Sequence, residues 1–329
     1  MLFCYSQTAR YGKATVLHCL KTLPQGSSKT VVKLPLVRDF AYDYGRVEQV
    51  SNLIRRVIAN NPSPFTFAGT GTYIVGRNNV AIIDPGPADQ LHIDAILQIL
   101  EGETITHVFV THTHADHSPG CALLNHQRRV TTYGFGAHQR FQDEDELIVE
   151  EPADFEFVPD VRAKHEEVIA GEDWTMRCLH TPGHTSNHMC YLLEEEKALF
   201  TGDHVMGWST SVISPPDGDM SDYMDSLQLL LDLDVDVYWP THGPPIHQPN
   251  AHVKAFIDHR LEREQQVLRC VSEGIHTIDQ MVPIIYESTK QILYPAAARS
   301  LYATIIHLIR NHKLTFSNEL YEGSKFFLA

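Results

Sequence analysis

Eleven residues, Val110-Thr-His-Thr-His-Ala-Asp-His-Ser-Pro-Gly120, place three histidines and one aspartate within six positions of the chain. A surface loop needs polar residues, but it has no physical reason to adopt this spacing. Alternate side chains on an extended segment point the same way, so His112 and His114 are predicted to bind one metal ion together. Asp116 and His117 follow where the chain is expected to turn into a helix, and we expect them to face a second ion nearby.

Two ions need more ligands than these four, and three further candidates follow other predicted strands. His184 comes after Thr-Pro-Gly, Asp203 after Thr-Gly, and His242 before Gly-Pro-Pro. Small or rigid neighbours let the backbone approach a crowded site. Loops at strand ends tend to gather where a rigid scaffold aims their side chains into one place. Since a carboxylate between two cations can bind both, Asp203 is the predicted bridge.

The apolar pattern around these motifs predicts alternating strands and helices, and therefore an α+β fold. The segments with the pattern of strands are 64–76, 79–83, 107–111, 174–179, 188–193, 198–201 and 235–239. Helical spacing recurs over 91–100 and 223–233. The first two strands are expected to form a hairpin-like pair. We expect residues 39–250 to form the catalytic domain.

The composition shifts to helix formers beyond this domain. The segment 251–273 is the longest helical candidate, and Thr277-Ile-Asp-Gln280 has the form of a capping box. Residues 295–312 place apolar side chains on one face, and 313–327 are expected to form a pair of strands. Three helices followed by a hairpin indicate a helical, winged-helix-like domain over residues 251–329.

The charge of the chain is unevenly distributed. The 329 residues are 43% hydrophobic and carry a formal charge of −15, yet residues 1–38 hold six basic residues and no acidic one. This basic leader is compatible with a flexible tail, a start codon placed too far upstream, or an organelle transit peptide. We expect a cytoplasmic protein, or one of the mitochondrial matrix if residues 1–38 are a transit peptide. The acidic remainder argues against sequence-independent binding of duplex nucleic acid.

The cysteines and the longest apolar runs exclude two further classes. Six cysteines lie far apart without a C-x-x-C pair, which favours a reducing compartment and argues against a disulfide framework. No apolar run approaches the roughly 20 residues that span a bilayer, so no membrane partner is expected.

The motifs His-x-His-x-Asp-His, Gly-His-Thr, Gly-Asp-His and Thr-His-Gly occur in this order and together resemble the metallo-β-lactamase superfamily. The resemblance implies an αββα sandwich with a dinuclear site over residues 64–250. Two zinc ions are expected, although an all-nitrogen and oxygen ligand set does not exclude manganese or iron. The resemblance assigns one ion to His112, His114 and His184, the other to Asp116, His117 and His242, and both to Asp203.

The chemistry expected from such a site is hydrolysis. Two zinc-like cations lower the pKa of a bridging water, so that a metal-bound hydroxide exists near neutral pH, and they polarise a carbonyl or phosphoryl oxygen. Asp116 is the candidate catalytic residue, which orients the hydroxide and relays its proton. Because a structural zinc is normally closed by four ligands, seven candidates favour an enzyme.

Two further segments narrow the resemblance. Tyr238-Trp-Pro-Thr-His-Gly-Pro-Pro-Ile-His247 and His259-Arg-Leu-Glu-Arg-Glu-Gln-Gln266, followed by the winged-helix-like tail, look like the lactamase-beta-like protein 2 branch. Animal members of that branch are mitochondrial endoribonucleases, so the resemblance implies single-stranded RNA as the substrate. Gly71 departs from the branch, which commonly has asparagine at this position.

Other interpretations stay open at this point. A thioester or lactone hydrolase similar to hydroxyacylglutathione hydrolase is the alternative, and a winged-helix nucleic-acid-binding protein with a structural metal is less favoured. Residues 288–318 contain basic but no acidic side chains, so they can contact phosphates, cover the catalytic domain or form a homo-oligomer contact. Residues 261–329 hold seven basic and seven acidic side chains, which fits a DNA-binding protein poorly.

Overall fold

The computed structural model describes residues 32–140 and 152–329, whose strands form two large sheets and one small one. The strands of the first sheet are neighbours in chain order: β1 (Val47–Gln49), β2 (Ile54–Ile58), β3 (Gly71–Val75), β4 (Asn79–Ile83), β5 (Thr104–Phe109), β6 (Thr131–Gly134) and β7 (Val161–Arg162). The second sheet has the order β12–β11–β10–β9–β8, from the strands β8 (Val168–Ala170), β9 (Thr175–His180), β10 (Met189–Leu193), β11 (Ala198–Gly202) and β12 (Val237–Pro240).

Helices connect three pairs of parallel neighbours in these sheets. Helix α1 (Gln90–Ile99) lies between β4 and β5, α2 (Gly120–Gln127) between β5 and β6, and α3 (Met220–Leu231) between β11 and β12. A crossover is required because the end of one parallel strand lies far from the start of the next. Asp89 and Asp219 cap α1 and α3 by accepting hydrogen bonds from backbone N–H groups of the first turn. The sequence therefore places a defined start on each of these two helices.

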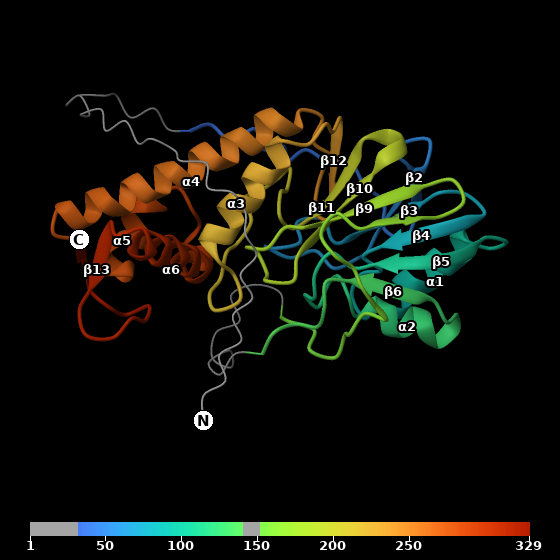
Figure 1. Ribbon diagram of the computed structural model, residues 1–329, viewed down its shortest axis with the longest axis horizontal. Coiled ribbons are helices and arrows are strands. Elements are labelled where there is room, and N and C mark those ends of the chain that lie inside the picture. Colours follow the sequence, from blue (N-terminus) through green and yellow to red (C-terminus); the bar gives the residue numbers. More distant parts are fainter. Residues whose placement is uncertain (1–31, 141–151) are drawn as a thin grey trace. The chain divides into compact units, whose positions relative to one another are not determined.

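Apolar side chains fill three layers of this domain. Ile93 of α1 and Leu124 of α2 pack on the outer face of the first sheet. Leu227 of α3 and Phe256 of α4 (Pro249–Ser272) pack on the outer face of the second sheet. Figure 1 shows the two sheets between these pairs of helices. The predicted αββα sandwich is therefore confirmed. The core between the sheets includes Tyr73, Phe109, Trp174, Tyr191 and Phe200.

The C-terminal unit follows α4 and has its own core. It consists of α5 (Ile278–Ile285), the 3₁₀ turn η2 (Gln291–Leu293), α6 (Tyr294–Arg310), and the antiparallel pair β13 (Leu314–Phe316) and β14 (Phe326–Leu328). Apolar residues of α4, α5 and α6 pack with those of the strand pair. The predicted winged-helix-like unit is confirmed.

Two details of the predicted elements were wrong. The segment 64–76 is not one strand, because residues 64–68 form turns and β3 begins only at Gly71. Hydrogen bonds to the backbone carbonyls of Asn61 and Ser63 stabilise those turns, whereas a strand would form hydrogen bonds with a neighbouring strand. The predicted capping box also fails: Thr277 is the residue before α5, but its side chain makes no capping hydrogen bond.

The basic leader lies only partly within the described residues. Residues 1–31, on which the targeting prediction falls, lie outside them. Leu34 and Leu36 pack against the core beneath α3 and α4, and the backbone N–H of Val37 donates to the carbonyl of Gly207 at 2.8 Å. One helical segment, 291–310, is long and apolar enough to cross a membrane by length and composition. It packs into the C-terminal core as the core helix of a globular unit does.

Candidate metal centre

All seven predicted ligands lie in loops at the carboxyl ends of strands. The loop after β5 supplies four of them, and the loops after β9, β11 and β12 supply one each. Each of the seven is buried, with at most 8% of its surface exposed. The structure therefore brings together, from both sheets, the side chains that the sequence predicted: His112, His114, Asp116, His117, His184, Asp203 and His242.

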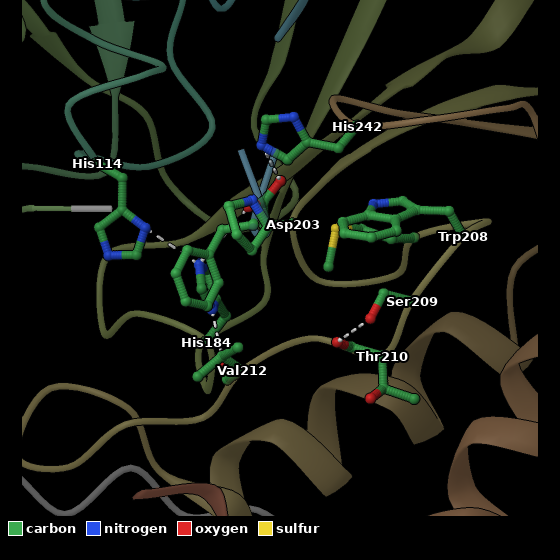
Figure 2. A pocket seen from close by; sticks show the side chains of 11 residues that line it. His114, His184, Asp203, Trp208, Ser209, Thr210, Val212 and His242 are labelled. Carbon is green, nitrogen blue, oxygen red and sulfur yellow. Dashed lines mark hydrogen bonds and ion pairs between the residues drawn. The ribbon is translucent and has the colours of Figure 1, made fainter. Parts of the chain in front are cut away.

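Three histidines form the first group of converging donor atoms. The Nε2 atom of His112 lies 3.0 Å from Nδ1 of His114, which in turn lies 3.2 Å from Nε2 of His184. Figure 2 shows His114 and His184 directed toward the same part of the pocket, with Asp203 beside them. Nitrogen atoms this close can share one cation at their centre.

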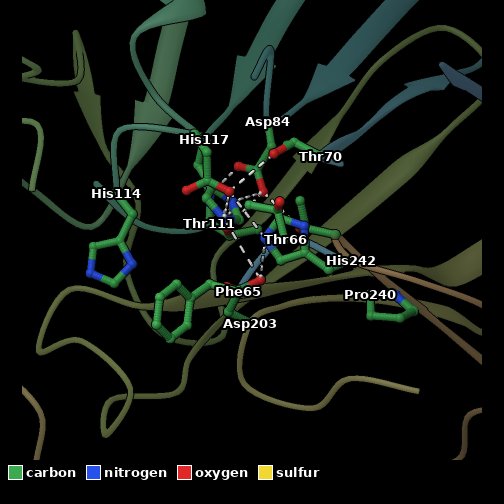
Figure 3. Close-up of polar contacts among 12 residues, drawn as sticks. Phe65, Thr66, Thr70, Asp84, Thr111, His114, His117, Asp203, Pro240 and His242 are labelled. Carbon is green, nitrogen blue, oxygen red and sulfur yellow. Dashed lines mark hydrogen bonds and ion pairs between the residues drawn. The ribbon is translucent and has the colours of Figure 1, made fainter. Parts of the chain in front are cut away.

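A second group gathers around Asp116. Its Oδ2 atom lies 3.0 Å from Nε2 of His242 and 3.4 Å from Nε2 of His117. Asp203 lies between the two groups, because its Oδ1 is 3.4 Å from His242 and 3.6 Å from His117, while its Oδ2 is 3.9 Å from Nε2 of His184. Figure 3 shows these contacts converging on Asp203.

The hydrogen-bonding inventory of the site fits bound cations. Three buried atoms, Oδ1 of Asp116, Nε2 of His117 and Oδ1 of Asp203, have no hydrogen-bond partner among the described residues. Buried polar atoms in folded proteins are normally paired, so three exceptions at one point need a physical reason. Cations bound between these atoms would satisfy all three, and imidazole with carboxylate suits zinc, manganese or iron.

Asp84 is not one of the candidate ligands, but it orients the candidate ligand His117. Its Oδ2 accepts a hydrogen bond from Nδ1 of His117 at 2.8 Å, which leaves Nε2 of that ring available to a cation. The same carboxylate accepts from the backbone N–H and hydroxyl of Thr111, each at 2.7 Å, and from the hydroxyl of Thr241 at 3.0 Å. Asp84 adopts a φ of +49°, an uncommon backbone conformation for a residue other than glycine. Four donors therefore fix this carboxylate (Figure 3).

Backbone carbonyls orient two other histidines. Nδ1 of His184 donates to the carbonyl of Val212 at 2.7 Å, and Nδ1 of His242 donates to the carbonyl of Gly69 at 3.2 Å. Each bond leaves the Nε2 atom of the ring facing the centre. The Thr70 hydroxyl donates to Oδ2 of Asp116 at 3.0 Å. The ring orientations are thus set before any ion binds.

The protonation of the metal-free centre follows from burial and from its neighbours. Burial and the neighbouring imidazoles hold the pKa of His112 well below its ordinary value, so this ring is neutral and ready to bind metal. Burial also lowers the pKa of His242, but Asp203 and Asp116 outweigh it and raise that pKa to about 10. Burial raises the pKa of Asp203, but His242 and His117 outweigh it and hold that pKa well below its usual value. Metal binding must therefore displace protons from part of the centre.

A pocket open to solvent lies over the candidate ligands. Among the described residues that line it there is no lysine or arginine, and apolar and hydroxyl side chains predominate. Figure 2 shows Trp208, Ser209 and Thr210 facing His114, His184 and Asp203 across this space. Beside the candidate ligands, the lining residues are Pro64, Phe65, Met206, Trp208, Ser209, Thr210 and Val212.

The prediction from sequence omitted Asp84, although a signal for it existed. The Asp84-Pro-Gly-Pro87 turn directly follows β4, so it has the same position at a strand end that identified the other motifs. The carbonyls of Gly69 and Val212 had no comparable signal, because any residue type can offer a backbone carbonyl.

Known proteins match both parts of the chain. A family model described as "Metallo-beta-lactamase superfamily" matches residues 66–242, and one described as "Beta-lactamase associated winged helix domain" matches residues 277–314. The crystal structure of a β-lactamase domain protein from Burkholderia ambifaria has a TM-score of 0.71 at 19% identity, covering 88% of this chain and 96% of that chain. At this identity the likeness shows the fold alone.

Two curated relatives are similar over most of their length. The β-lactamase-like protein 2 homolog of Drosophila melanogaster is 31% identical over 284 residues, or 82% of this chain and 92% of the relative. The atrochrysone carboxyl ACP thioesterase of Aspergillus chevalieri is 30% identical over 292 residues, or 85% of this chain and 87% of the relative.

Proposed function

Because the chain belongs to the metallo-β-lactamase superfamily, as its motifs predicted, we propose that its hydrolase centre binds two divalent metal ions, with zinc as the first candidate. Bound ions would lower the pKa of a coordinated water and polarise the oxygen of a carbonyl or phosphoryl group. The convergence of seven buried side chains, three of whose nitrogen or oxygen atoms have no hydrogen-bond partner among the described residues, supports this proposal. His112, His114 and His184 would hold one ion, Asp116, His117 and His242 would hold the other, and Asp203 would contribute to both.

Asp116 orients the attacking water and accepts its proton in this proposal. Its Oδ2 is held by the hydroxyl of Thr70 and by His242, whereas its Oδ1 has no hydrogen-bond partner within the described part of the chain. Burial raises the pKa of Asp116, but His117 and His242 outweigh it and lower that pKa to about 2, so the carboxylate is ionised at neutral pH. A carboxylate with so low a pKa is a weak base, so its part is to orient the water through a hydrogen bond and to relay the proton onward rather than keep it.

The substrate that the cavity fits best is a thioester. Its described lining residues include no lysine or arginine, and an uncharged acyl group needs no such side chain, whereas a phosphodiester carries a negative charge on every unit. The relative named as a thioesterase is similar over 85% of this chain, which supports the same choice. The lining of the cavity is the observation that carries this proposal.

Single-stranded RNA is the second candidate substrate. The winged-helix domain and the likeness to the β-lactamase-like protein 2 homolog favour it, through the branch resemblance noted above. The basic side chains of residues 288–318 give little support to an RNA substrate, because three of the four already pair with carboxylates. These pairs are Arg299 with Glu322, Arg310 with Asp219, and Lys313 with Glu264.

One experiment tests the centre and separates the substrates. Purified protein is stripped with a chelator, reloaded with zinc and assayed on acyl thioesters of increasing size and on single-stranded RNA oligonucleotides. We expect zinc-dependent thioester hydrolysis that Asp116→Asn abolishes while zinc remains bound. RNA cleavage without thioester turnover would favour the second candidate, and activity that persists after complete metal removal would refute the mechanism.

A further inference from the structure

A single peptide group connects the candidate metal centre with the C-terminal unit. The carbonyl of Val212 accepts the hydrogen bond from Nδ1 of His184 at 2.7 Å, and the next N–H along the chain, that of Ile213, donates to the hydroxyl oxygen of Ser300 at 3.2 Å. This carbonyl and this N–H belong to the same planar peptide group. Figure 2 shows the contact between His184 and Val212. A side chain of α6 therefore lies one peptide group away from a candidate metal ligand.

The contact between Ser300 and the loop is shielded from water. Ile213 is 0% exposed and Ser300 is 7% exposed. A buried N–H that lost its partner could not pair with water instead, so the bond constrains the orientation of the peptide group. The hydroxyl of Ser300 is the partner that the described residues provide for this N–H.

Helix α4, which leads into the C-terminal unit, holds the same loop at a neighbouring position. Arg260 of α4 is 5% exposed and donates to the carbonyl of Ser211 at 2.6 Å. The hydroxyl of Ser211 in turn donates to the carbonyl of Asp203 at 2.5 Å. Helices α4 and α6 thus hold consecutive peptide groups of the loop that runs from the candidate ligand Asp203 to Val212, whose carbonyl orients His184.

A hydrogen bond to one end of a peptide group strengthens the bond at its other end, because the group polarises as a unit. Donation from Ile213 to Ser300 makes the carbonyl of Val212 a better acceptor for His184. A histidine whose Nδ1–H has a stronger acceptor keeps its tautomer and orientation and binds a cation more tightly through Nε2.

We propose that Ser300 is a positioning residue for His184, so that the C-terminal unit completes the metal centre of the catalytic domain. This inference rests on the proposed metal centre but not on the identity of the substrate. It gives the winged-helix-like domain a role in metal binding that requires no nucleic acid.

The test compares Ser300→Ala with Thr304→Ala, a matched control one turn further along α6. Thr304 is also buried, but its hydroxyl donates to the carbonyl of Ser300 within the same helix and not to a backbone group of the loop. Zinc affinity of the full chain is measured by competition with a chromophoric chelator, and the visible absorption of the cobalt-loaded protein reports the ligand geometry.

We expect Ser300→Ala to weaken zinc binding roughly threefold to tenfold, less than the roughly tenfold to hundredfold effect of a residue that contacts a ligand directly, because Ser300 acts through a peptide group. It should also change the cobalt spectrum, whereas Thr304→Ala should match wild type in both measurements. Ser300→Thr retains the hydroxyl and should restore most of the affinity. If Ser300→Ala does not fold, Ser300→Cys replaces it, since a thiol is a weak acceptor of similar size and should also weaken binding.

Two results would overturn the inference, and they differ from failure of the proposed function. Equal zinc affinities and equal cobalt spectra for Ser300→Ala and Thr304→Ala would show that Ser300 only packs α6 against the loop. The same conclusion would follow if Ser300→Cys bound zinc as wild type does. If the wild-type protein itself bound no zinc or cobalt, the proposed metal centre would be wrong.

Discussion

Asp84→Asn is the substitution that tests the support of the metal centre most directly. The carboxylate accepts hydrogen bonds from four buried donors, three at Oδ2 and one at Oδ1. An asparagine has one acceptor oxygen and one NH₂ group, so it cannot accept at both positions. Its better orientation keeps the oxygen toward His117 and turns the NH₂ group toward the backbone N–H of Thr111.

The cost follows from that geometry. Two donors then face each other in a fully buried site, and each unsatisfied group costs about 1 to 3 kcal/mol. The remaining bonds also lose the charge that strengthened them. We therefore expect Asp84→Asn to lower the free energy of unfolding of the metal-free protein by about 2 to 4 kcal/mol. Zinc affinity should fall roughly tenfold to a hundredfold, because His117 loses its charged acceptor.

Asp160→Asn is the matched control. Asp160 accepts from both the backbone N–H and the hydroxyl of Thr132, each at 2.9 Å, but it does so with one oxygen, Oδ2, whereas Asp84 uses both of its oxygens for Thr111. It is exposed and lies outside the groups of candidate ligands, so the control should cost less than about 1 kcal/mol and leave zinc affinity unchanged. Urea unfolding in the presence of a chelator and zinc titration measure the two effects. Equal losses for both variants would refute the argument that Asp84 supports the centre.

Two further substitutions test the backbone and the charges of the site. Gly183 has a φ of +135°, and a Cβ added there would lie 2.3 Å from Cα of Tyr223, so Gly183→Ala should lower unfolding free energy by more than about 2 kcal/mol. Gly102 has a φ of +88° and open space around it, so Gly102→Ala should lower the free energy of unfolding only by the backbone strain of about 1 to 2 kcal/mol. Equal losses of unfolding free energy for the two substitutions would contradict the steric argument. The pKa of His242 is raised from 6.5 to about 10 in the metal-free native state. The interactions of its protonated ring with Asp203 and Asp116 therefore stabilise that state fully below pH 6.5 and progressively less up to pH 10. His242→Gln should therefore destabilise the chelator-treated protein more at pH 6 than at pH 10 in urea unfolding, and equal losses would exclude this linkage.

The sequence alone identified the candidate site because its residues carry distinctive patterns. Histidine and aspartate at strand ends, flanked by glycine and proline, are rare enough in combination to be found without a structure. Many of the strands and helices around them follow from apolar periodicity, but the sequence analysis missed the strands β1, β2, β6, β7 and β8 and assigned the turns at residues 64–68 to a strand. Asp84 could have been found by the same rule, since it also follows a strand.

Tertiary structure alone decided which charges are available to a substrate. The sequence showed basic residues in the C-terminal unit and left their role open. In the folded chain, Arg310 and Lys313 pair with Asp219 and Glu264, which lie 91 and 49 positions away along the chain. Local composition cannot reveal such pairs, because the distance between partners depends on how the two units pack.

The same limit applies to the support of His184. Its partner is a backbone carbonyl 28 positions away, and the next N–H pairs with Ser300, 87 positions from Ile213. A backbone group has no residue type that would single it out in a sequence. The ligands could therefore be predicted from their side chains, whereas the peptide group that orients one of them became identifiable only after α6 was placed against its loop.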